Sequence, residues 1–292
     1  MRVLIINGFD RCGSSLIGGL LGKHPDVAYF FQPLSSTEVH RTQYDIWRAD
    51  HEAPGTEDFF RGIVNGRIDQ EFITADWFER HSTSLQIRPE KLNLIKETKL
   101  HFKIDWLRAR FPQIGILGIW RDPRAVVCSL VRNGFHRKWY GQPAFDAIGR
   151  VVRTEPALAP LRDLLDEPLD EVEQMAVIVA ARTRVMADCL ETDDWIVFED
   201  ILADPNAALG PVLERWGLEP FDFAPHIYED YNVVGRPFES SSIWRTYFSG
   251  RQIERLNAIF GACRLLDSDM ASGSTSLEGT RCLTRKSSEP RS

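Results

Sequence analysis

Residues 3–23 read Val-Leu-Ile-Ile-Asn-Gly-Phe-Asp-Arg-Cys-Gly-Ser-Ser-Leu-Ile-Gly-Gly-Leu-Leu-Gly-Lys. The four apolar residues that open this stretch are typical of a strand that is buried on both faces. Gly8 and Gly13 bracket a loop, and the leucines from Leu16 onward return at helical spacing. A strand, a glycine-bracketed loop and a helix together point backbone N–H groups and a helix N-terminus at a bound phosphate. The stretch therefore predicts a phosphate-binding loop.

The spacing of this loop is that of a Walker A motif with one change. A Walker lysine would follow Gly13, but the residue there is Ser14, and the nearest cation is Arg11. A nucleoside triphosphatase would therefore lack the cation that reaches its β- and γ-phosphates. A loop that binds a shorter phosphate group could instead use Arg11, which approaches the phosphate from the side opposite to a Walker lysine. The alternative is an ordinary strand-to-helix turn that happens to carry two glycines.

Length and charge restrict the remaining function classes. The chain has 292 residues, enough for one large α/β domain or two small ones. Its formal charge of −7 and pI of about 5.6 argue against a general nucleic-acid binder. The first predicted strand begins at Val3 and no apolar run is long enough to span a bilayer. We therefore expect a cytoplasmic protein without a signal peptide or a membrane anchor.

The five cysteines are scattered, odd in number and without a C-x-x-C pair. This pattern favours reduced thiols and argues against a zinc site. Cys12 lies inside the predicted phosphate loop, where it is either a small packing residue or a reactive thiol with a lowered pKa. The sequence shows no cluster of metal ligands, and we expect a protein that needs no metal.

Four further apolar segments are predicted to be strands, at residues 27–31, 92–95, 114–120 and 195–198. Helical patterns follow them, after Pro123 and over residues 169–190, 205–216 and 250–266, whereas the proline-punctuated residues 141–165 are expected to be loop with a short helix. Strands that alternate with helices predict one α/β domain with a mostly parallel sheet. This domain is expected to cover residues 1–267, with a helical insertion over residues 35–90 that lies on the acceptor side. Residues 268–292 are rich in Ser, Gly and Thr and are expected to be disordered.

A second stretch that suits phosphate binding follows the clearest of the predicted strands. It reads Arg121-Asp122-Pro123-Arg124-Ala125-Val126-Val127-Cys128-Ser129. Ligands of open parallel sheets bind at the carboxyl ends of the strands, where the glycine loop also lies. Arg121 leaves the strand end and Ser129 lies on the next helix, so both are placed to converge on one phosphate. A structural ion pair between Arg121 and Asp122 at the start of the helix is the alternative.

Together the two stretches resemble the sulfotransferases that use the sulfate donor PAPS (3′-phosphoadenosine 5′-phosphosulfate). Arg11-Cys12-Gly13-Ser14-Ser15-Leu16 looks like the family's 5′-phosphosulfate loop, in the form common among carbohydrate sulfotransferases. Arg121 and Ser129 look like the arginine and the serine that hold the 3′-phosphate. Residues 96–112 and Phe198-Glu199-Asp200-Ile201 with Asp204-Pro205 are similar to two further family segments.

The resemblance spans roughly residues 3–266 and implies a P-loop NTPase-like three-layer fold, the donor PAPS, its product 3′,5′-adenosine bisphosphate (PAP), and no metal. It also implies roles for single residues. Arg11, the loop amides and Lys96 are expected to stabilise the charge that develops on the leaving phosphate, and the lysine is expected to donate to it. Trp244 and Arg245, in a late loop, are assigned to nucleotide binding.

One position departs from the family pattern. Where many relatives carry Glu-Pro-Leu after the second strand, this chain has Gln32-Pro33-Leu34. The family's glutamate is the general base, and glutamine cannot take a proton. We assign Gln32 to acceptor positioning and name four candidates for the base, in order of preference Glu97, Glu38, His40 and His101. An acidic or amine acceptor that needs little activation, or a protein that has lost transfer activity, would also explain Gln32.

These patterns predict a sulfotransferase that moves the sulfuryl group of PAPS to a hydroxyl of a small molecule or glycan. Nucleic acid and membrane are not expected as partners, and the sequence does not give the oligomeric state. One rival is a P-loop kinase or other nucleotide hydrolase, which the missing Walker lysine disfavours. The other is a nucleotide-binding protein with an inactive site, which Gln32 favours. We expect residues 35–90 and 134–165 to form the acceptor pocket. No motif in these segments identifies the acceptor.

Overall fold

The computed structural model describes residues 1–68, 76–227 and 241–266. Within these parts of the chain, one sheet is formed by the strands β1 (Arg2–Asn7), β2 (Val27–Phe31), β3 (Leu92–Glu97), β4 (Ile114–Trp120) and β5 (Trp195–Val197). Their order across the sheet is β2-β3-β1-β4-β5, and every neighbouring pair is parallel. The predicted α/β class with a mostly parallel central sheet is therefore confirmed.

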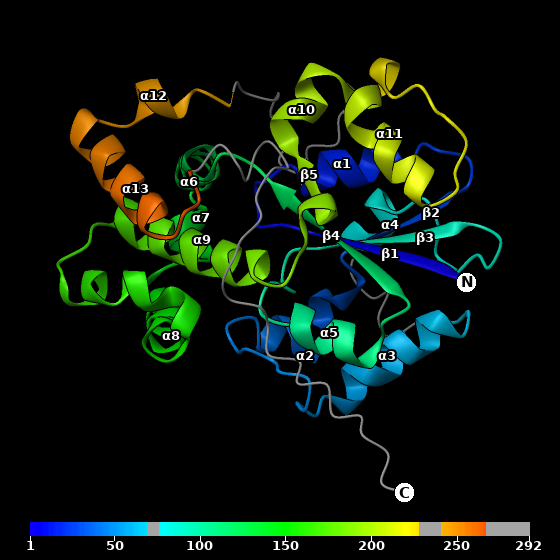
Figure 1. The fold of residues 1–292 in the computed structure, drawn as a ribbon, viewed down its shortest axis with the longest axis horizontal. Coiled ribbons are helices and arrows are strands. Elements are labelled where there is room, and N and C mark those ends of the chain that lie inside the picture. Colours follow the sequence, from blue (N-terminus) through cyan, green and yellow to red (C-terminus); the bar gives the residue numbers. More distant parts are fainter. Residues whose placement is uncertain (69–75, 228–240, 267–292) are drawn as a thin grey trace, which may run out of the picture.

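Helices cover both faces of this sheet (Figure 1). One face packs against α1 (Ser14–Leu21), α10 (Phe198–Ala203) and α11 (Pro205–Arg215), and the other against α2 (Glu38–Arg41), α3 (Pro54–Val64) and α5 (Ile104–Arg110). Successive side chains of β1 enter the two cores in turn, Leu4 on the α1 face and Ile5 on the α5 face. Because a strand covered on both faces has no polar side, the run from Val3 to Ile6 is uninterrupted in the sequence.

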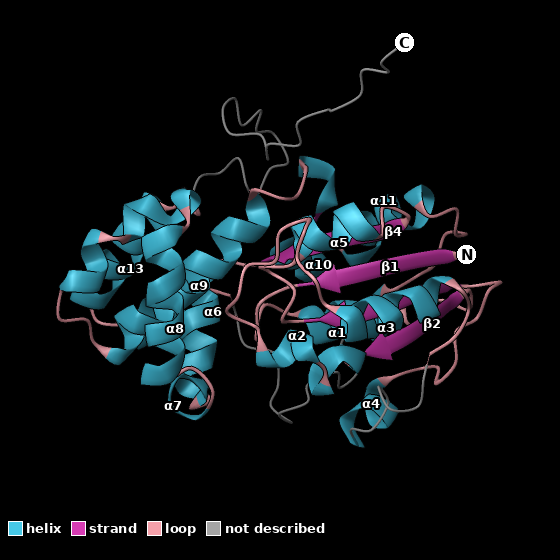
Figure 2. Ribbon diagram, turned by 90° about the horizontal axis from the view of Figure 1, so that it is seen from below, coloured by secondary structure: helices cyan, strands magenta, loops and turns pink. Residues whose placement is uncertain are grey.

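A second group of helices stands beyond the carboxyl ends of the strands (Figure 2). It consists of α6 (Pro123–Arg132), α7 (Phe135–Lys138), α8 (Gln142–Thr154), α9 (Glu171–Ala187), α12 (Trp244–Tyr247) and α13 (Gly250–Ala262). Helix α9 lies inside this group, buried along most of its length and in contact with α6, α8 and α13. The loops that leave the strand ends therefore face this group of helices, which we call the helical wall. Open parallel sheets bind their ligands at this edge of the sheet.

The predicted elements correspond closely to those of the structure. All five strands lie where they were predicted, although Phe198 starts α10 and does not end β5. Helix α8 is longer than expected, with 13 residues in a segment for which loop and a short helix were predicted. Its prolines do not break it, because Pro143 lies in the first turn and Pro156 lies beyond the last residue.

The insertion that was predicted over residues 35–90 contains α2 and α3, with α4 (Asp76–His81) after the gap in the described residues. Residues 268–292, for which disorder was predicted, lie outside the described residues. Within the described ranges, no helix combines the length and the apolar character that a membrane crossing requires.

Candidate active site

The glycine-bracketed loop connects β1 to α1 and has a backbone that few residues adopt. Gly13, which precedes the first helical turn, has a φ of 97°, and Arg11 has a φ of 71°. A Cβ at Gly13 would lie 2.1 Å from a ring carbon of Phe198, so that a larger residue does not fit. The first amides of α1 have no partners within the helix, and the glycine before them offers no side-chain cap. These amides give the loop the hydrogen-bond donors that an oxyanion requires.

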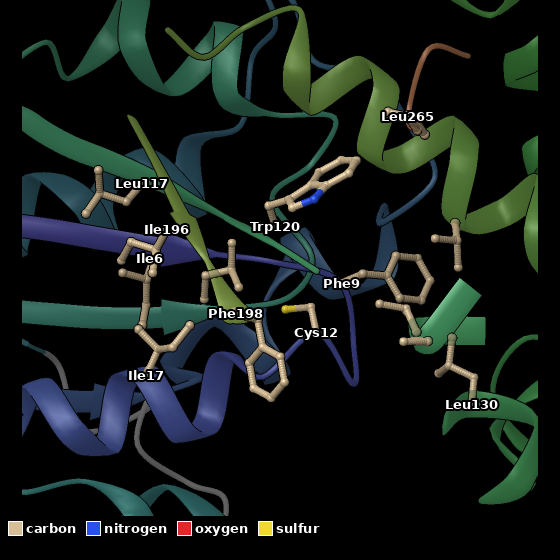
Figure 3. Packing of buried hydrophobic residues seen from close by; sticks show 14 of the residues in the cluster. Ile6, Phe9, Cys12, Ile17, Leu117, Trp120, Leu130, Ile196, Phe198 and Leu265 are labelled. Carbon is tan, nitrogen blue, oxygen red and sulfur yellow. The ribbon is translucent and has the colours of Figure 1, made fainter. Parts of the chain in front are cut away.

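Cys12 anchors the loop in the core beside Phe9, Trp120 and Phe198 (Figure 3). It is 2% exposed. A Cβ at Gly8 would lie 2.4 Å from the Cys12 sulfur, so the two residues are closely packed. Burial raises the pKa of the Cys12 thiol to about 11. The thiol is therefore protonated at neutral pH, which supports the packing role of Cys12 over the reactive one.

The two stretches that were predicted to bind phosphate meet in space. The Nε of Arg11 donates to the Oγ of Ser129 at 3.1 Å, and the Nη1 of Arg121 donates to the Arg11 carbonyl at 2.8 Å. The Arg121 guanidinium lies 4.4 Å from the centre of the Phe198 ring, and its Nε is buried without a hydrogen-bond partner. Buried donors are almost always satisfied, so this nitrogen is suited to receive a ligand.

The alternative of a structural ion pair between Arg121 and Asp122 is not what the structure contains. Asp122 caps α6 by accepting from the backbone N–H of Arg124, and its carboxylate pairs with the Arg124 side chain at 2.9 Å. Arg124 also lies 4.2 Å from the centre of the Trp244 ring, which is buried. Arg245 lies 4.4 Å from the same ring and is exposed to solvent. Of the two late residues assigned to nucleotide binding, Trp244 is thus held beside the start of α6 and Arg245 lies on its outer side.

Lys96 occupies the end of β3 on the face that packs against α1. Its side chain is buried, with its Nζ 4.4 Å from the centre of the Phe31 ring. No described side chain or carbonyl forms a hydrogen bond with this ammonium group. Burial lowers the pKa of Lys96 to about 8, against the opposing effect of Asp10 and Glu97. At neutral pH Lys96 is a buried cation with its donors available.

Glu97 is the next residue of β3, and strand alternation turns it to the opposite face of the sheet. Its Oε1 accepts a hydrogen bond from the backbone N–H of Leu34 at 2.8 Å. Burial raises the pKa of Glu97 to about 7. The carboxyl group therefore lies beside the turn that follows β2, separated from Lys96 by the plane of the sheet.

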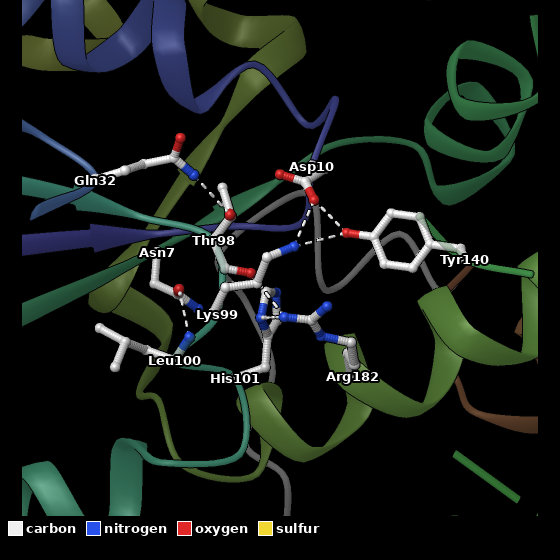
Figure 4. A network of polar contacts seen from close by, with 9 residues as sticks. All are labelled: Asn7, Asp10, Gln32, Thr98, Lys99, Leu100, His101, Tyr140 and Arg182. Atoms are coloured by element: carbon white, nitrogen blue, oxygen red, sulfur yellow. Dashed lines mark hydrogen bonds and ion pairs between the residues drawn. The ribbon is translucent and has the colours of Figure 1, made fainter. Parts of the chain in front are cut away.

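Gln32 leaves the end of β2 with a φ of 48°, and its Nε2 donates to the Thr98 hydroxyl at 2.9 Å (Figure 4). The other candidate bases differ in exposure. Glu38 and His40 lie on α2 and are partly exposed, whereas His101 is fully buried. Burial and the charge of Arg182 lower the pKa of His101 well below its ordinary value, so its ring is neutral.

Comparison with known proteins agrees with this geometry. A family model described as "Sulfotransferase family" matches residues 4–222. The chain belongs to the sulfotransferase family.

Solved structures of sulfotransferases are similar to about nine-tenths of this chain. A sulfotransferase domain from the curacin biosynthetic pathway has a TM-score of 0.50 at 14% identity, covering 89% of this chain and 97% of its own. A sulfotransferase from Alicyclobacillus acidocaldarius has 17% identity, coverages of 90% and 99%, and a TM-score of 0.40. One from Mycobacterium tuberculosis H37Rv has 15% identity, coverages of 89% and 76%, and a TM-score of 0.40. At this identity, the likeness to the curacin domain concerns the P-loop-like three-layer fold. No curated protein matches the chain.

The sulfotransferase chain also contains a polar network that motif reasoning missed (Figure 4). Lys99 donates from its Nζ to the carboxylate of Asp10 at 2.7 Å and to the hydroxyl of Tyr140 at 2.9 Å. The Tyr140 hydroxyl donates to the same carboxylate. Burial opposes ionisation of Asp10, yet Lys99 and Tyr140 hold its pKa below the usual range. The network ties the glycine loop of the sulfotransferase to the end of β3 and to the helical wall.

Arg182 of α9 adjoins this network, and its Nη2 donates to the Thr98 carbonyl at 2.7 Å. The sequence does carry a signal for this residue, because Arg182 directly follows the apolar run from Met175 to Ala181 in the middle of a predicted helix. Within the described part of the sulfotransferase, no group of three or more His, Cys, Asp or Glu residues could hold a metal ion.

Proposed function

We propose that this sulfotransferase takes its sulfuryl group from PAPS and transfers it to a hydroxyl of a small molecule or glycan. The observation that carries the proposal is the meeting of the two phosphate motifs, in which Arg11 bonds to Ser129 and Arg121 bonds to the Arg11 carbonyl. A nucleotide with phosphates on the 3′ and the 5′ positions of one ribose needs two such sites close together. Membership of the sulfotransferase family supports the same donor.

The residues fit PAPS as a ligand. The Nε of Arg121 is buried and has no hydrogen-bond partner. Arg121 and Ser129 are both bonded to Arg11, an arrangement that suits the 3′-phosphate. The loop from Arg11 to Leu16, with its uncapped helix N-terminus, suits the 5′-phosphosulfate. Trp244 and Arg245 would complete the nucleotide site on the α6 side.

The transfer requires stabilisation of charge on the leaving phosphate. When bound, PAPS supplies a sulfuryl group whose S–O bond to the 5′-phosphate breaks with the electron pair remaining on the phosphate oxygen. Lys96 is cationic at neutral pH, lies in a buried setting, and has donors available for that oxygen. Charge stabilisation by a preorganised donor in such a setting is worth several kcal/mol. We assign this role to Lys96 together with Arg11.

The acceptor hydroxyl must lose a proton as its oxygen bonds to sulfur. We propose Glu97 as the base, because a pKa of about 7 matches the working range of a general base. Gln32 is proposed to orient the acceptor. Its Nε2 is committed to Thr98, while its amide oxygen points away from Thr98 and remains an acceptor for a hydroxyl (Figure 4).

The experiment that tests this function is a transfer assay with PAPS and a panel of alcohols, phenols and sugars, in which PAP and sulfated products are quantified by chromatography. PAP release that depends on the acceptor and equals the sulfated product supports the proposal. Tight PAP binding with no product from any hydroxyl acceptor would favour the inactive nucleotide-binding protein that Gln32 suggests. Turnover of magnesium-ATP would instead favour a kinase or hydrolase.

A further inference from the structure

Arg182 is a buried cation that lacks an anionic partner. The residue is 0% exposed. Its Nη2 donates to the Thr98 carbonyl at 2.7 Å and lies 3.1 Å from the Nδ1 of His101, but its Nε and Nη1 have no hydrogen-bond partner. No carboxylate of the described residues forms an ion pair with it. A buried guanidinium in this state is costly, since both its charge and its remaining donors are uncompensated.

The residues around Arg182 are mostly basic and do not supply the missing negative charge. Burial, and then the charge of Arg182 itself, lowers the pKa values of Lys103 and His101, and Arg182 also lowers that of Lys99. The carboxylate of Asp10 is the nearby anion, and it is already shared by Lys99 and Tyr140. Lys99 and Arg182 therefore share the neighbourhood of a single carboxylate, and Lys99 already occupies it.

Two other groups near Arg182 also have unused hydrogen-bonding capacity. The hydroxyl of Tyr44 and the Nε2 of His101 are buried and make no hydrogen bond. The segment that carries Tyr44 is held beside the cluster, because the Nζ of Lys103 donates to the carbonyls of Thr42 and Asp45 on either side of it. Three side chains from separate segments thus leave polar atoms unsatisfied at one place. A carboxylate accepts hydrogen bonds from guanidinium and phenol donors, so it would satisfy most of them together.

The location of Arg182 is on the acceptor side of the proposed site. Its guanidinium lies 4.8 Å from the centre of the Phe9 ring in the glycine loop. Through Thr98 it is connected to Gln32, because the Thr98 carbonyl binds Arg182 and the Thr98 hydroxyl binds Gln32 (Figure 4). Arg11 and Arg121, the proposed donor ligands, bond instead to each other and to α6.

We propose that Arg182 anchors a carboxylate of the acceptor, so that the substrate is a hydroxy acid and not a neutral alcohol or sugar. This inference rests on the proposed function and specifies its substrate class. The carboxylate takes donors from Nη1 or Nε of Arg182 and from the Tyr44 hydroxyl. Gln32 then lies within the same bonded chain of residues, where it can orient the hydroxyl that is to be sulfated.

The test compares hydroxy acids with their own methyl esters as acceptors, for example 4-hydroxyphenylacetate and its ester. The wild-type enzyme is expected to prefer the acid by about 30-fold or more in kcat/KM, as the loss of a buried charge pair implies. Arg182→Gln should abolish the preference, chiefly through the KM of the acid. The matched control is Arg184→Gln on the same helix, because Arg184 already pairs with Asp188 and should leave the preference unchanged.

Three measurements keep the test decisive. PAP affinity is measured for each variant by calorimetry, which reports on the proposed function separately from Arg182. If Arg182→Gln fails to fold, the preference for acid over ester is measured for Arg182→Lys and for the wild-type enzyme instead. If no panel member is sulfated, binding of 4-hydroxyphenylacetate and its ester to the PAP-loaded protein gives the same ratio.

Several results would overturn the inference. Equal use of acids and esters by the wild-type enzyme would remove the need for an anchoring cation. A loss of PAPS affinity in Arg182→Gln as large as the loss for the acceptor would assign Arg182 to the donor site. Preference for a phosphate monoester over the carboxylate would show that the class of anion is wrong.

Discussion

The donor side and the acceptor side of this site are built in different ways. The proposed donor residues come from two short stretches at the ends of adjacent strands β1 and β4, and they contact one another directly through Arg11 and Arg121. The proposed acceptor side takes Arg182 from α9, Tyr140 from the connection between α7 and α8, and Lys99 from the segment after β3. Segments far apart in the chain meet there (Figures 2 and 4).

This difference explains what each side can be used for. A phosphate site made of a strand end, a loop and a helix start is specified by local sequence, so the same donor can be bound by a recurring motif. An acceptor site that is assembled from separate segments has no such local constraint. It can change its charge and shape without disturbing the donor loop, and specificity is expected to be determined there.

The largest expected effect lies on the donor side. Arg121→Ala should weaken PAP binding by about 100-fold or more, because a buried charged donor to phosphate is lost. Calorimetry gives the affinity, and thermal unfolding shows whether the fold is retained. Arg137→Ala serves as the control, since that arginine pairs with Glu171 at the surface. Equal PAP affinity in the two variants would contradict the assignment of Arg121.

Lys96→Met should separate binding from chemistry. We expect kcat to fall by about 10²–10³-fold, the usual loss for one donor to a developing oxyanion, with PAP affinity changed only a few-fold. The variant should also unfold at a higher temperature, because an ammonium group whose pKa is lowered by burial is replaced by an apolar chain of similar length. A loss of affinity as large as the loss of kcat would place Lys96 in ground-state binding.

The pH dependence of kcat tests the acceptor side. Glu97, with a pKa raised to about 7, must be ionised to accept a proton, so the rate should fall as the pH drops below about 7. Lys96, with a pKa lowered to about 8, must be protonated to donate, so the rate should also fall above about 8. Glu97→Gln should remove the acidic limb and lower kcat by about 10²-fold. An acidic limb that persists in this variant would exclude Glu97 as its origin.

The last effect is on stability alone and concerns the backbone of the donor loop. Gly13→Ala is expected to destabilise the fold by about 2–4 kcal/mol, since the added Cβ meets the Phe198 ring in a left-handed conformation. Gly217→Ala is the matched control, because Gly217 also has a positive φ but has nothing within 4 Å of the added atom. It should cost only about 1 kcal/mol in chemical denaturation. Equal losses would mean that the contact with Phe198 is unimportant.

The sequence predicted the sheet, and it picked out the two stretches proposed for the donor side, because these depend on local patterns. Continuous apolar runs identified the strands, and the glycine spacing identified the loop that contains Arg11. The length of α8 was missed because its prolines were interpreted as breaks, although both lie at positions a helix tolerates. The positions of Lys96 and Glu97 on opposite faces follow from strand alternation once β3 is known to extend to Glu97.

The acceptor cluster could not be predicted in the same way. Asp10, Lys99 and Tyr140 come from three segments whose meeting depends on how the helical wall packs against the strand ends. Arg182, next to an apolar run, was the one member of this group that the sequence pattern could single out, and an arginine in a helix does not indicate which residues lie beside it. The cytoplasmic location and the boundaries of the domain stay predictions of the sequence.

The measurement that tests the central claim most directly is a calorimetric titration of the wild-type protein with PAP, with AMP and with magnesium-ATP. AMP shares the 5′-phosphate of PAP and lacks only the 3′-phosphate, so the pair isolates the site assigned to Arg121 and Ser129. The structure predicts that PAP binds without magnesium and at least about 100-fold more tightly than AMP. Equal affinity for PAP and AMP, or a preference for magnesium-ATP, would contradict the donor site proposed for this sulfotransferase.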